Sequence, residues 1–227
     1  MTARGLRPLR WPDIPRAARM MAGAYLVKAA PDARSRSRVA LTAATAVAFA
    51  LSLAIYRPLV RYWRDPKDGR RQTVVAITPR GRTIVPVLRL VLGLALYAAL
   101  VFGPDLDPAN AGARVALGVL SLLAVAAGLV TGPAILVAAW VLGRRTYEGK
   151  IACAGPAVPG TQLTAGLAAS TSAAGMLAVR ADLAEHHGGE RLTVRARDVD
   201  ALAIYGRLGL EVVEPGCGRM TGIIPGR

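Results

Sequence analysis

The stretch that decides the class of this protein is VALGVLSLLAVAAGLVTGPAILVAAWVL, residues 115–142. Its 28 residues include no charged side chain, and its polar groups are those of Ser121, Thr131 and Trp140. As a helix it extends roughly 42 Å, and about 20 apolar residues cross a hydrocarbon core. Gly132-Pro133 offers a place for a kink. Soluble helices of this length normally have a charged face, so we expect an integral membrane protein.

The composition agrees with this expectation. The 227 residues are 53% hydrophobic and 5% aromatic, with 29 Lys and Arg against 14 Asp and Glu. A net charge of +15 is typical of loops that face anionic lipid headgroups. Nucleic acid is the other acidic partner that such a charge suggests. Because the chain has no aromatic-interleaved basic patch or helix-turn-helix pattern, we expect the lipid bilayer and its anionic headgroups as partners, and no nucleic acid.

The cysteines and the N-terminal residues argue against further classes of protein. Cys153 and Cys217 are far apart and have no CxxC or Cys/His spacing, so we expect neither a disulfide framework nor a metal site. The first apolar run starts only near Val39, which does not fit a signal peptide.

Three apolar runs, residues 39–56, 83–102 and 115–142, define a membrane region at 39–143. Residues 57–83 and those from 143 onward are basic, whereas 103–114 contains two aspartates and one arginine. The positive-inside rule therefore predicts a hairpin of the last two runs whose loop faces outward, in the cell membrane, with a cytoplasmic C-terminal domain. If residues 39–56 also span, the nine Lys and Arg of residues 1–38 lie outside, against the rule. We favour an interfacial or re-entrant first run with both termini inside, and three spans stay the alternative.

The basic N-terminal segment, residues 1–38, has two interpretations. Residues 5–9 suit a short edge strand, followed by a helix that Asp13 caps and that carries Ile14 and Pro15 in its first turn. This pair of elements belongs to a folded domain. The alternative is an amphipathic helix on the inner leaflet, with Arg16, Arg19 and Lys28 among the headgroups.

The sequence predicts that the C-terminal tail, from residue 144 onward, contains a folded domain. A linker at 144–160, rich in Gly and Pro, leads to a C-terminal domain at 161–227. Its pattern predicts strand 162–169, helix 173–187 stopped by Gly188-Gly189, strand 191–196, helix 199–208 capped by Asp198, and strand 210–213. The predicted fold class is α/β or α+β, combined with a helical membrane region of two to three transmembrane helices.

Residues 198–213, D-V-D-A-L-A-I-Y-G-R-L-G-L-E-V-V, resemble the C-terminal motif N-x-x-A-x-x-x-Y-x-x-x-G-F of the GNAT superfamily of acyl-CoA N-acetyltransferases. Ala201, Tyr205 and Gly209 match in register, Asp198 stands for the usual Asn, and Leu210 for the usual Phe. The N-terminal strand and helix are also similar to the opening of that family's domain. The resemblance covers about residues 5–27 and 160–224, so the apolar block interrupts a degenerate GNAT-like α+β domain.

The resemblance implies acetyl-CoA as a substrate, bound at the N-terminus of the helix at 173–187. The family's pyrophosphate loop, Q/R-x-x-G-x-G/A, aligns with residues 170–175, where the leading Arg or Gln is missing and Ala173 replaces a glycine. Backbone N–H groups at the positive end of a helix dipole suit phosphate. The implied cofactor-binding residues are Ser170, Ser172, Ala173, Ala174, Gly175, Met176 and Asp198. An ordinary helix cap at this place is the alternative.

The resemblance also implies that Tyr205 is the general acid that protonates the departing CoA thiolate. A tyrosine that merely packs on the sheet is the alternative. The amine acceptor is not identified, and Glu148 is only a guess for the general base. The chain is thus expected to be a membrane-anchored acyltransferase, or else a non-catalytic membrane protein whose acetyltransferase-like tail is a binding or structural module.

Overall fold

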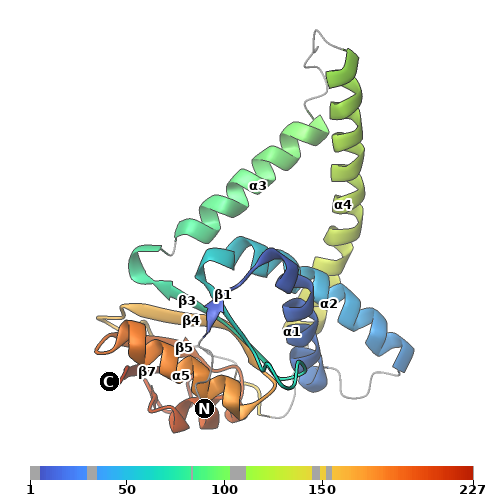
Figure 1. The fold of residues 1–227 in the computed structure, drawn as a ribbon. Coiled ribbons are helices and arrows are strands. Elements are labelled where there is room, and N and C mark those ends of the chain that lie inside the picture. Colours follow the sequence, from blue (N-terminus) through green and yellow to red (C-terminus); the bar gives the residue numbers. More distant parts are fainter. Residues whose placement is uncertain are drawn as a thin grey trace.

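The computed structural model describes residues 6–29, 35–82, 84–102, 111–144, 149–151 and 155–226. A mixed seven-stranded sheet forms its centre, with the strand order β1-β2-β3-β4-β5-β7-β6 (Figure 1). The strands are β1 (Arg7–Pro8), β2 (Val60–Arg64), β3 (Gln72–Pro79), β4 (Leu163–Ser170), β5 (Arg191–Arg195), β6 (Glu211–Val212) and β7 (Arg219–Ile223). Strands β4 and β5 run parallel, and the other strand pairs of the described chain are antiparallel.

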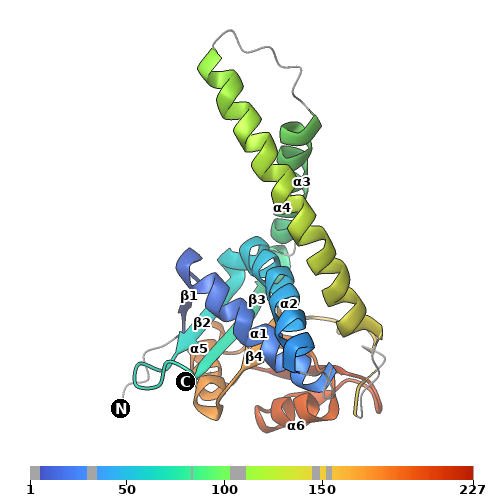
Figure 2. The same ribbon diagram turned by 90° about the vertical axis from the view of Figure 1, so that its right-hand side faces the viewer.

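Helices cover both faces of the sheet (Figure 2). The helices are α1 (Ile14–Ala29), α2 (Ser35–Tyr56), α3 (Ile84–Phe102), α4 (Ala111–Arg144), α5 (Ala173–His187) and α6 (Val199–Arg207), with short 3-10 turns η1 (Trp11–Asp13), η2 (Arg57–Leu59) and η3 (Arg80–Arg82). On one face, Met21 of α1 and Leu53 of α2 are fully buried in a cluster with Val60 and Val74. On the other face, α5 packs through Ala178, Val179 and Leu183. The domain is therefore a three-layer α/β structure.

Helices α3 and α4 leave this domain as a long hairpin (Figures 1 and 2). Three stretches are long and apolar enough to cross a membrane: Arg38–Leu59, Arg80–Ala99 and Gly118–Leu136. Helix α4 continues through Pro133 as one helix, so the Gly-Pro step does not end it. Residues 103–110, which carry most of the predicted outward loop, lie outside the described residues.

The pairing of β3 with β4 corrects the sequence-based division of the chain. That division assigned residues 57–83 to the membrane region, but β2 and β3 are central strands of the same sheet as β4. Tyr62 and Trp63 follow closely on the first apolar run, and they are buried in the two cores of the folded domain. The hairpin α3–α4 thus stands where a short turn would join two antiparallel strands.

The local elements of both ends agree with the sequence analysis. Residues 5–9 were expected to hold an edge strand, and β1 pairs with β2 through Arg7↔Tyr62 and Pro8↔Arg61. In the tail, α5 has its predicted bounds, and β4, β5, α6 and β6 differ by one or two residues at their ends. Strand β7 was not predicted. It lies between β5 and β6 and completes the sheet.

Candidate functional site

The parallel strands β4 and β5 part from each other, and the predicted site residues lie at the end of β4 and on the segments that follow these two strands. The two strands pair only from Leu163↔Leu192 to Ala165↔Val194, although β4 continues to Ser170. In sheets of this kind, ligands bind outside the carboxyl ends of parallel strands, at the point where the sheet's connectivity changes. The opening is therefore the place where the topology favours a ligand.

Strand β4 is irregular at the same point. Val74 pairs with Ala169 and Ala76 pairs with Gly166, so β4 contains one extra residue opposite β3. Leu167 within this bulge has a φ of 47°, a left-handed conformation that non-glycine residues rarely adopt. Such a conformation costs about 1–3 kcal/mol and is found preferentially at functional sites. A bulge also leaves a strand's backbone groups unpaired next to the opening.

The turn from β4 into α5 contains most of the predicted cofactor-binding residues. Ser170 Oγ lies 2.6 Å from Thr73 Oγ1 and donates to the Ser172 carbonyl at 2.8 Å. Ser172 is the N-cap of α5, and its hydroxyl accepts from the Gly175 N–H at 3.2 Å. These two hydroxyls therefore hold the turn, as expected of an ordinary helix cap, and are already engaged within the chain.

The remaining amides of this turn differ in their availability. The Met176 N–H donates to the Ser172 carbonyl at 3.4 Å, so it is used within the helix. Ala173 and Ala174 are exposed at the first two positions of α5, and the described residues include no acceptor for their N–H groups. A helix leaves its first N–H groups without intrahelical partners, and those groups attract anions. Two of the predicted phosphate donors are thus open to a ligand.

Gly175 allows β3 and α5 to approach closely. A Cβ at this position would contact Thr73 Oγ1, and it would lie 2.9 Å from the Thr73 Cβ and 3.1 Å from Trp63 Cε3. Gly175 was predicted to bind the cofactor; it is buried, and in the structure its role is to allow this close packing.

Tyr205 lies on α6, partly buried against the same core as α5. Burial raises the pKa of its phenol to about 12; the nearby Tyr25 and Asp198 also raise it, and the Arg197 guanidinium lowers it. Below that pKa the phenol keeps its proton, so it is a hydrogen-bond donor at physiological pH. This is the state that the resemblance requires of a residue facing a departing thiolate.

Two residues that the sequence analysis missed connect α1 to the surroundings of Tyr205. The Arg197 guanidinium lies 3.9 Å from the centre of the Tyr25 ring, and its Nη2 donates to the Ala24 carbonyl at 3.3 Å. Arg197 lies two residues after the end of β5, and Tyr25 belongs to α1. No sequence motif pointed to this contact, because it joins residues that are far apart in the chain.

Asp198, predicted as a cofactor contact, has structural partners. It is buried, its Oδ1 accepts from the Ala201 N–H at 2.8 Å, and its Oδ2 lies 3.2 Å from Arg197 Nε. The aspartate is thus the N-cap of α6, as the helix pattern predicted. Gly209, another match to the motif, ends this helix with a φ of 89°, a conformation that favours glycine.

A short segment of the predicted linker lies in the opening. The Ile151 N–H donates to the Arg197 carbonyl and the Val199 N–H donates to the Gly149 carbonyl, each at 3.0 Å. The Gln162 N–H donates to the Arg191 carbonyl. The backbone N–H and C=O groups of every second residue of β5, counted from Arg191, therefore face β4. Arg197 is six residues after Arg191, so its carbonyl faces the same side. Residues 149–151, which bind to this carbonyl through Ile151, therefore lie on the β4 side. The sequence analysis treated residues 144–160 as a linker and missed this pairing.

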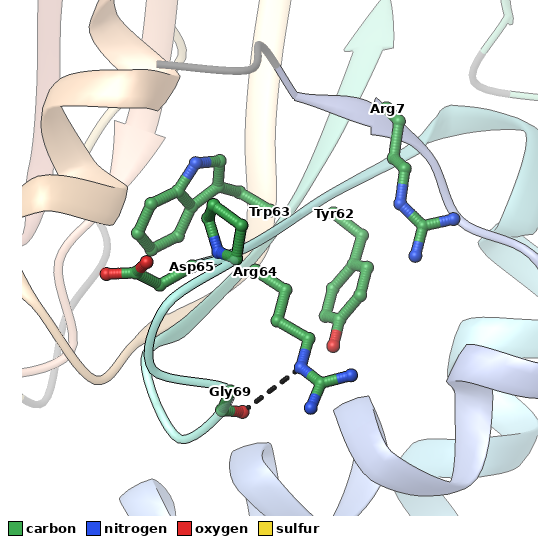
Figure 3. A pocket seen from close by; sticks show the side chains of 7 residues that line it. Arg7, Tyr62, Trp63, Arg64, Asp65 and Gly69 are labelled. Atoms are coloured by element: carbon green, nitrogen blue, oxygen red, sulfur yellow. Dashed lines mark hydrogen bonds between the residues drawn. The ribbon is translucent and has the colours of Figure 1, made fainter. Parts of the chain in front are cut away.

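The described cavity lies elsewhere, at the β2–β3 turn (Figure 3). It has a volume of about 360 Å³ and is lined by Arg7, Tyr62, Trp63, Arg64, Asp65, Pro66 and Gly69. Arg7 forms an ion pair with Asp13 at 2.9 Å, and Arg64 Nε donates to the Gly69 carbonyl at 3.2 Å. Because β3 separates β2 from β4 in the sheet, this cavity is not part of the β4–β5 opening. We assign it no ligand.

Among the described residues no cluster of His, Cys, Asp and Glu fits a metal ion. His186 and His187 sit at the C-terminal end of α5, beside Asp182 and Glu190 respectively. Glu148, the guess for a general base, lies outside the described residues. In comparisons with protein-family models, curated proteins and solved structures, nothing matches this chain.

Proposed function

We propose that this protein is a membrane-anchored, GNAT-like N-acetyltransferase that transfers acetyl from acetyl-CoA to an amine. The observation that carries the proposal is the parting of β4 and β5 between the open amides of Ala173 and Ala174 and the neutral phenol of Tyr205. The first feature suits a pyrophosphate and the second suits a leaving thiolate. Both belong to the segments that carry the resemblance.

The reaction would proceed by attack of the amine nitrogen on the thioester carbonyl carbon. As the carbon–sulfur bond breaks, the electron pair moves to sulfur, and the Tyr205 phenol donates a hydrogen bond to the developing thiolate. The amine nitrogen loses its extra proton to solvent, and the released CoA thiolate takes up a proton from solvent. A thiol has a pKa near ~8.5 and an ordinary phenol near ~10, so full proton transfer from a phenol is uphill. Burial makes it more so, and the nearby Arg197 guanidinium offsets part of that cost by stabilising the phenolate.

The membrane hairpin supports an anchored enzyme. A sheet with open edges cannot lie across a bilayer, so all strands of this sheet lie on one side. Strands β3 and β4 are neighbours, and the chain between them must cross the membrane an even number of times. The two apolar helices α3 and α4 satisfy this condition. With the basic segments inside, the domain and both chain ends lie in the cytoplasm.

Saturable binding of acetyl-CoA to the purified full chain tests the proposal. Isothermal titration calorimetry should give binding that Ala174→Pro weakens by about 1–3 kcal/mol, because proline removes one N–H donor and is tolerated in the first turn of a helix. Ala174→Ser is the matched control, since it keeps the N–H. Absence of saturable binding to the wild-type protein would overturn the enzyme assignment.

One observation favours a second candidate, a domain without turnover. Residues 149–151 pair along Arg197 and Val199 and so occupy part of the opening that acetyl-CoA needs. In that case the tail is a binding or structural module of a membrane protein. A protein that binds no acetyl-CoA but keeps its cooperative unfolding transition would support this candidate.

A further inference from the structure

Helix α2 is apolar over most of its length, and it packs against α1, the sheet and α4 while leaving several apolar side chains exposed. Thr45, Phe49 and Leu53 recur every four residues and are buried against α1 and the sheet. Val39, which is 71% exposed, Ala43, and Leu51, which is 37% exposed, lie away from this buried stripe. No charged residue occurs from Val39 to Tyr56. A helix side that faces water normally carries charged or polar residues, so this side needs an apolar cover.

Helix α2 does not reach this apolar cover by crossing the membrane. Strand β1 precedes α1 and α2, strand β2 follows them, and the two strands pair through Arg7↔Tyr62 and Pro8↔Arg61. The chain between them therefore crosses the membrane an even number of times. Helix α1 has only 16 residues, contains Arg16, Arg19 and Lys28, and is not among the candidate spans. With α1 excluded, α2 makes no crossing, although it is long and apolar enough for one.

The position of α2 brings it to the membrane surface. It contacts α1 and the sheet below, and it also contacts α3 and α4. In Figure 1 it passes beneath the base of the hairpin that these two helices form. Ala134 is the buried residue near the lower end of α4. The part of α4 above it, from Gly118, has the length of a membrane span.

An aromatic and basic pair lies at the C-terminal end of α2. The guanidinium of Arg57, the residue after α2, lies 4.9 Å from the ring centre of Trp11. Trp11 is 59% exposed, although tryptophan is on average a highly buried residue type. Tryptophan is enriched at the headgroup level of membranes, and arginine pairs with lipid phosphates there.

We propose that α2 is an interfacial helix, whose Val39–Ala43–Leu51 side lies at the acyl–headgroup boundary of the inner leaflet. The occupant of this surface is the bilayer itself, and the Trp11–Arg57 pair lies among its headgroups. The inference rests on the hairpin part of the proposed function and not on acetyl transfer. It places the three-layer domain directly against the membrane, with α2 as the shared layer between protein core and lipid.

Depth-dependent fluorescence quenching tests this inference in the full chain. Single cysteines at Val39, Ala43 and Leu51, in a background with Cys153→Ser and Cys217→Ser, are labelled with an environment-sensitive dye. The proteins are reconstituted in vesicles of phosphatidylcholine and phosphatidylglycerol that carry a nitroxide either near the headgroup or deep in the acyl chain. Leu96 in α3 and Ile223 in β7, both exposed, are the deep and the aqueous controls. Each labelled protein must unfold at the temperature of its unlabelled form.

We expect all three α2 positions to lose more fluorescence to the shallow nitroxide than to the deep one, with equal ratios along the helix. An interfacial helix is buried by roughly 5–10 Å at one depth. A ratio that changes systematically from Val39 to Leu51 would mean that α2 crosses the bilayer. Lack of quenching by either nitroxide would mean that water or a second protein copy covers this side. Either result overturns the inference.

The controls separate this inference from the proposals on which it rests. If Leu96 is not quenched by the deep nitroxide, the membrane hairpin itself fails. If Leu96 behaves as expected and the α2 positions do not, only the interfacial helix fails. Acetyl-CoA titrations with the same vesicles report on the enzyme proposal independently, because none of the labelled positions lies in the β4–β5 opening.

Discussion

The hydroxyl oxygens of Thr73 and Ser170 share a 2.6 Å hydrogen bond, although 97 positions separate the two residues in the chain. This bond ties β3, which precedes the α3–α4 hairpin, to the turn that begins α5. The Thr73 side chain also packs against Gly175, where a Cβ would contact it. The geometry of the predicted phosphate-binding turn therefore depends on a strand from the other side of the hairpin.

Gly175→Ala should lower the thermal stability and the affinity for acetyl-CoA together. The new Cβ forces apart Thr73, Trp63 and the first turn of α5, and such overpacking costs about 1–3 kcal/mol. The intrinsic preference of a helix for Ala over Gly returns about 0.5–1 kcal/mol. Thermal unfolding and calorimetric titration measure the two effects. Gly206→Ala is the matched control, since a Cβ there meets nothing within 4 Å, and it should raise stability.

Tyr205→Phe should leave acetyl-CoA affinity nearly unchanged and slow acetyl transfer by roughly 10²- to 10⁴-fold, because the developing thiolate loses the group that stabilises it by hydrogen bonding. The ring and its packing remain, and only the donor is lost. Single-turnover kinetics with a panel of amines measures the effect. Wild-type turnover in the phenylalanine variant would show that Tyr205 is a packing residue.

The same variant should change the alkaline stability of the protein. The phenol has a pKa of 10.0 in the unfolded chain, and burial raises it to about 12 in the folded one. A raised pKa gives a contribution to stability that is complete below pH 10 and is lost as the pH rises from 10 toward 12. Denaturant unfolding across this range should therefore show a steeper loss for wild type than for Tyr205→Phe. Tyr62, whose pKa burial also raises, is common to both proteins and cancels in the difference.

Asp198→Ala should destabilise the domain by about 1–2 kcal/mol, because the N-cap of α6 loses its acceptor. Asp198→Asn keeps a capping oxygen and should be close to wild type in stability. The asparagine variant also separates the two roles of this residue. A tenfold or greater loss of acetyl-CoA affinity at unchanged stability would show a contact with the cofactor, whereas unchanged affinity assigns Asp198 to the fold alone.

Cysteine accessibility tests the topology. Asn110→Cys, between α3 and α4, should react with an impermeant thiol reagent in intact cells. Leu177→Cys, at an exposed position of α5, should react only after lysis. Both belong in the background that lacks Cys153 and Cys217. Labelling of Leu177→Cys in intact cells would invert the predicted orientation.

The elements with local signals were predictable from the sequence, and those with distant partners were not. Asp198 and Gly209 bracket α6 through their own capping chemistry, so its bounds followed from a few adjacent residues. Strand β2 was missed because VRYWR follows an apolar run directly, and its aromatic residues resemble those of a membrane interface. Only pairing with β3 shows that Tyr62 and Trp63 are core residues.

The candidate site shows the same limit. Ser172 was a recognisable N-cap, and Tyr205 was found through a motif of adjacent positions. The contact of Arg197 with Tyr25, and the pairing of residues 149–151 along α6 and the end of β5, depend on how the sheet is assembled. A sequence pattern reports the period of an element and its caps, and it contains no information on which distant segments meet.

The position of the α3–α4 hairpin between β3 and β4 also sets an order of synthesis. Strand β3 emerges from the ribosome early, but its partner β4 is made only after both apolar helices, and the parallel pair with β5 comes later still. Until then β3 presents an unpaired edge and an apolar surface, a state prone to aggregation. In the proposed topology, insertion of the α3–α4 hairpin would bring the two halves of the sheet to the same side of the bilayer, so the sheet would be completed only at the membrane.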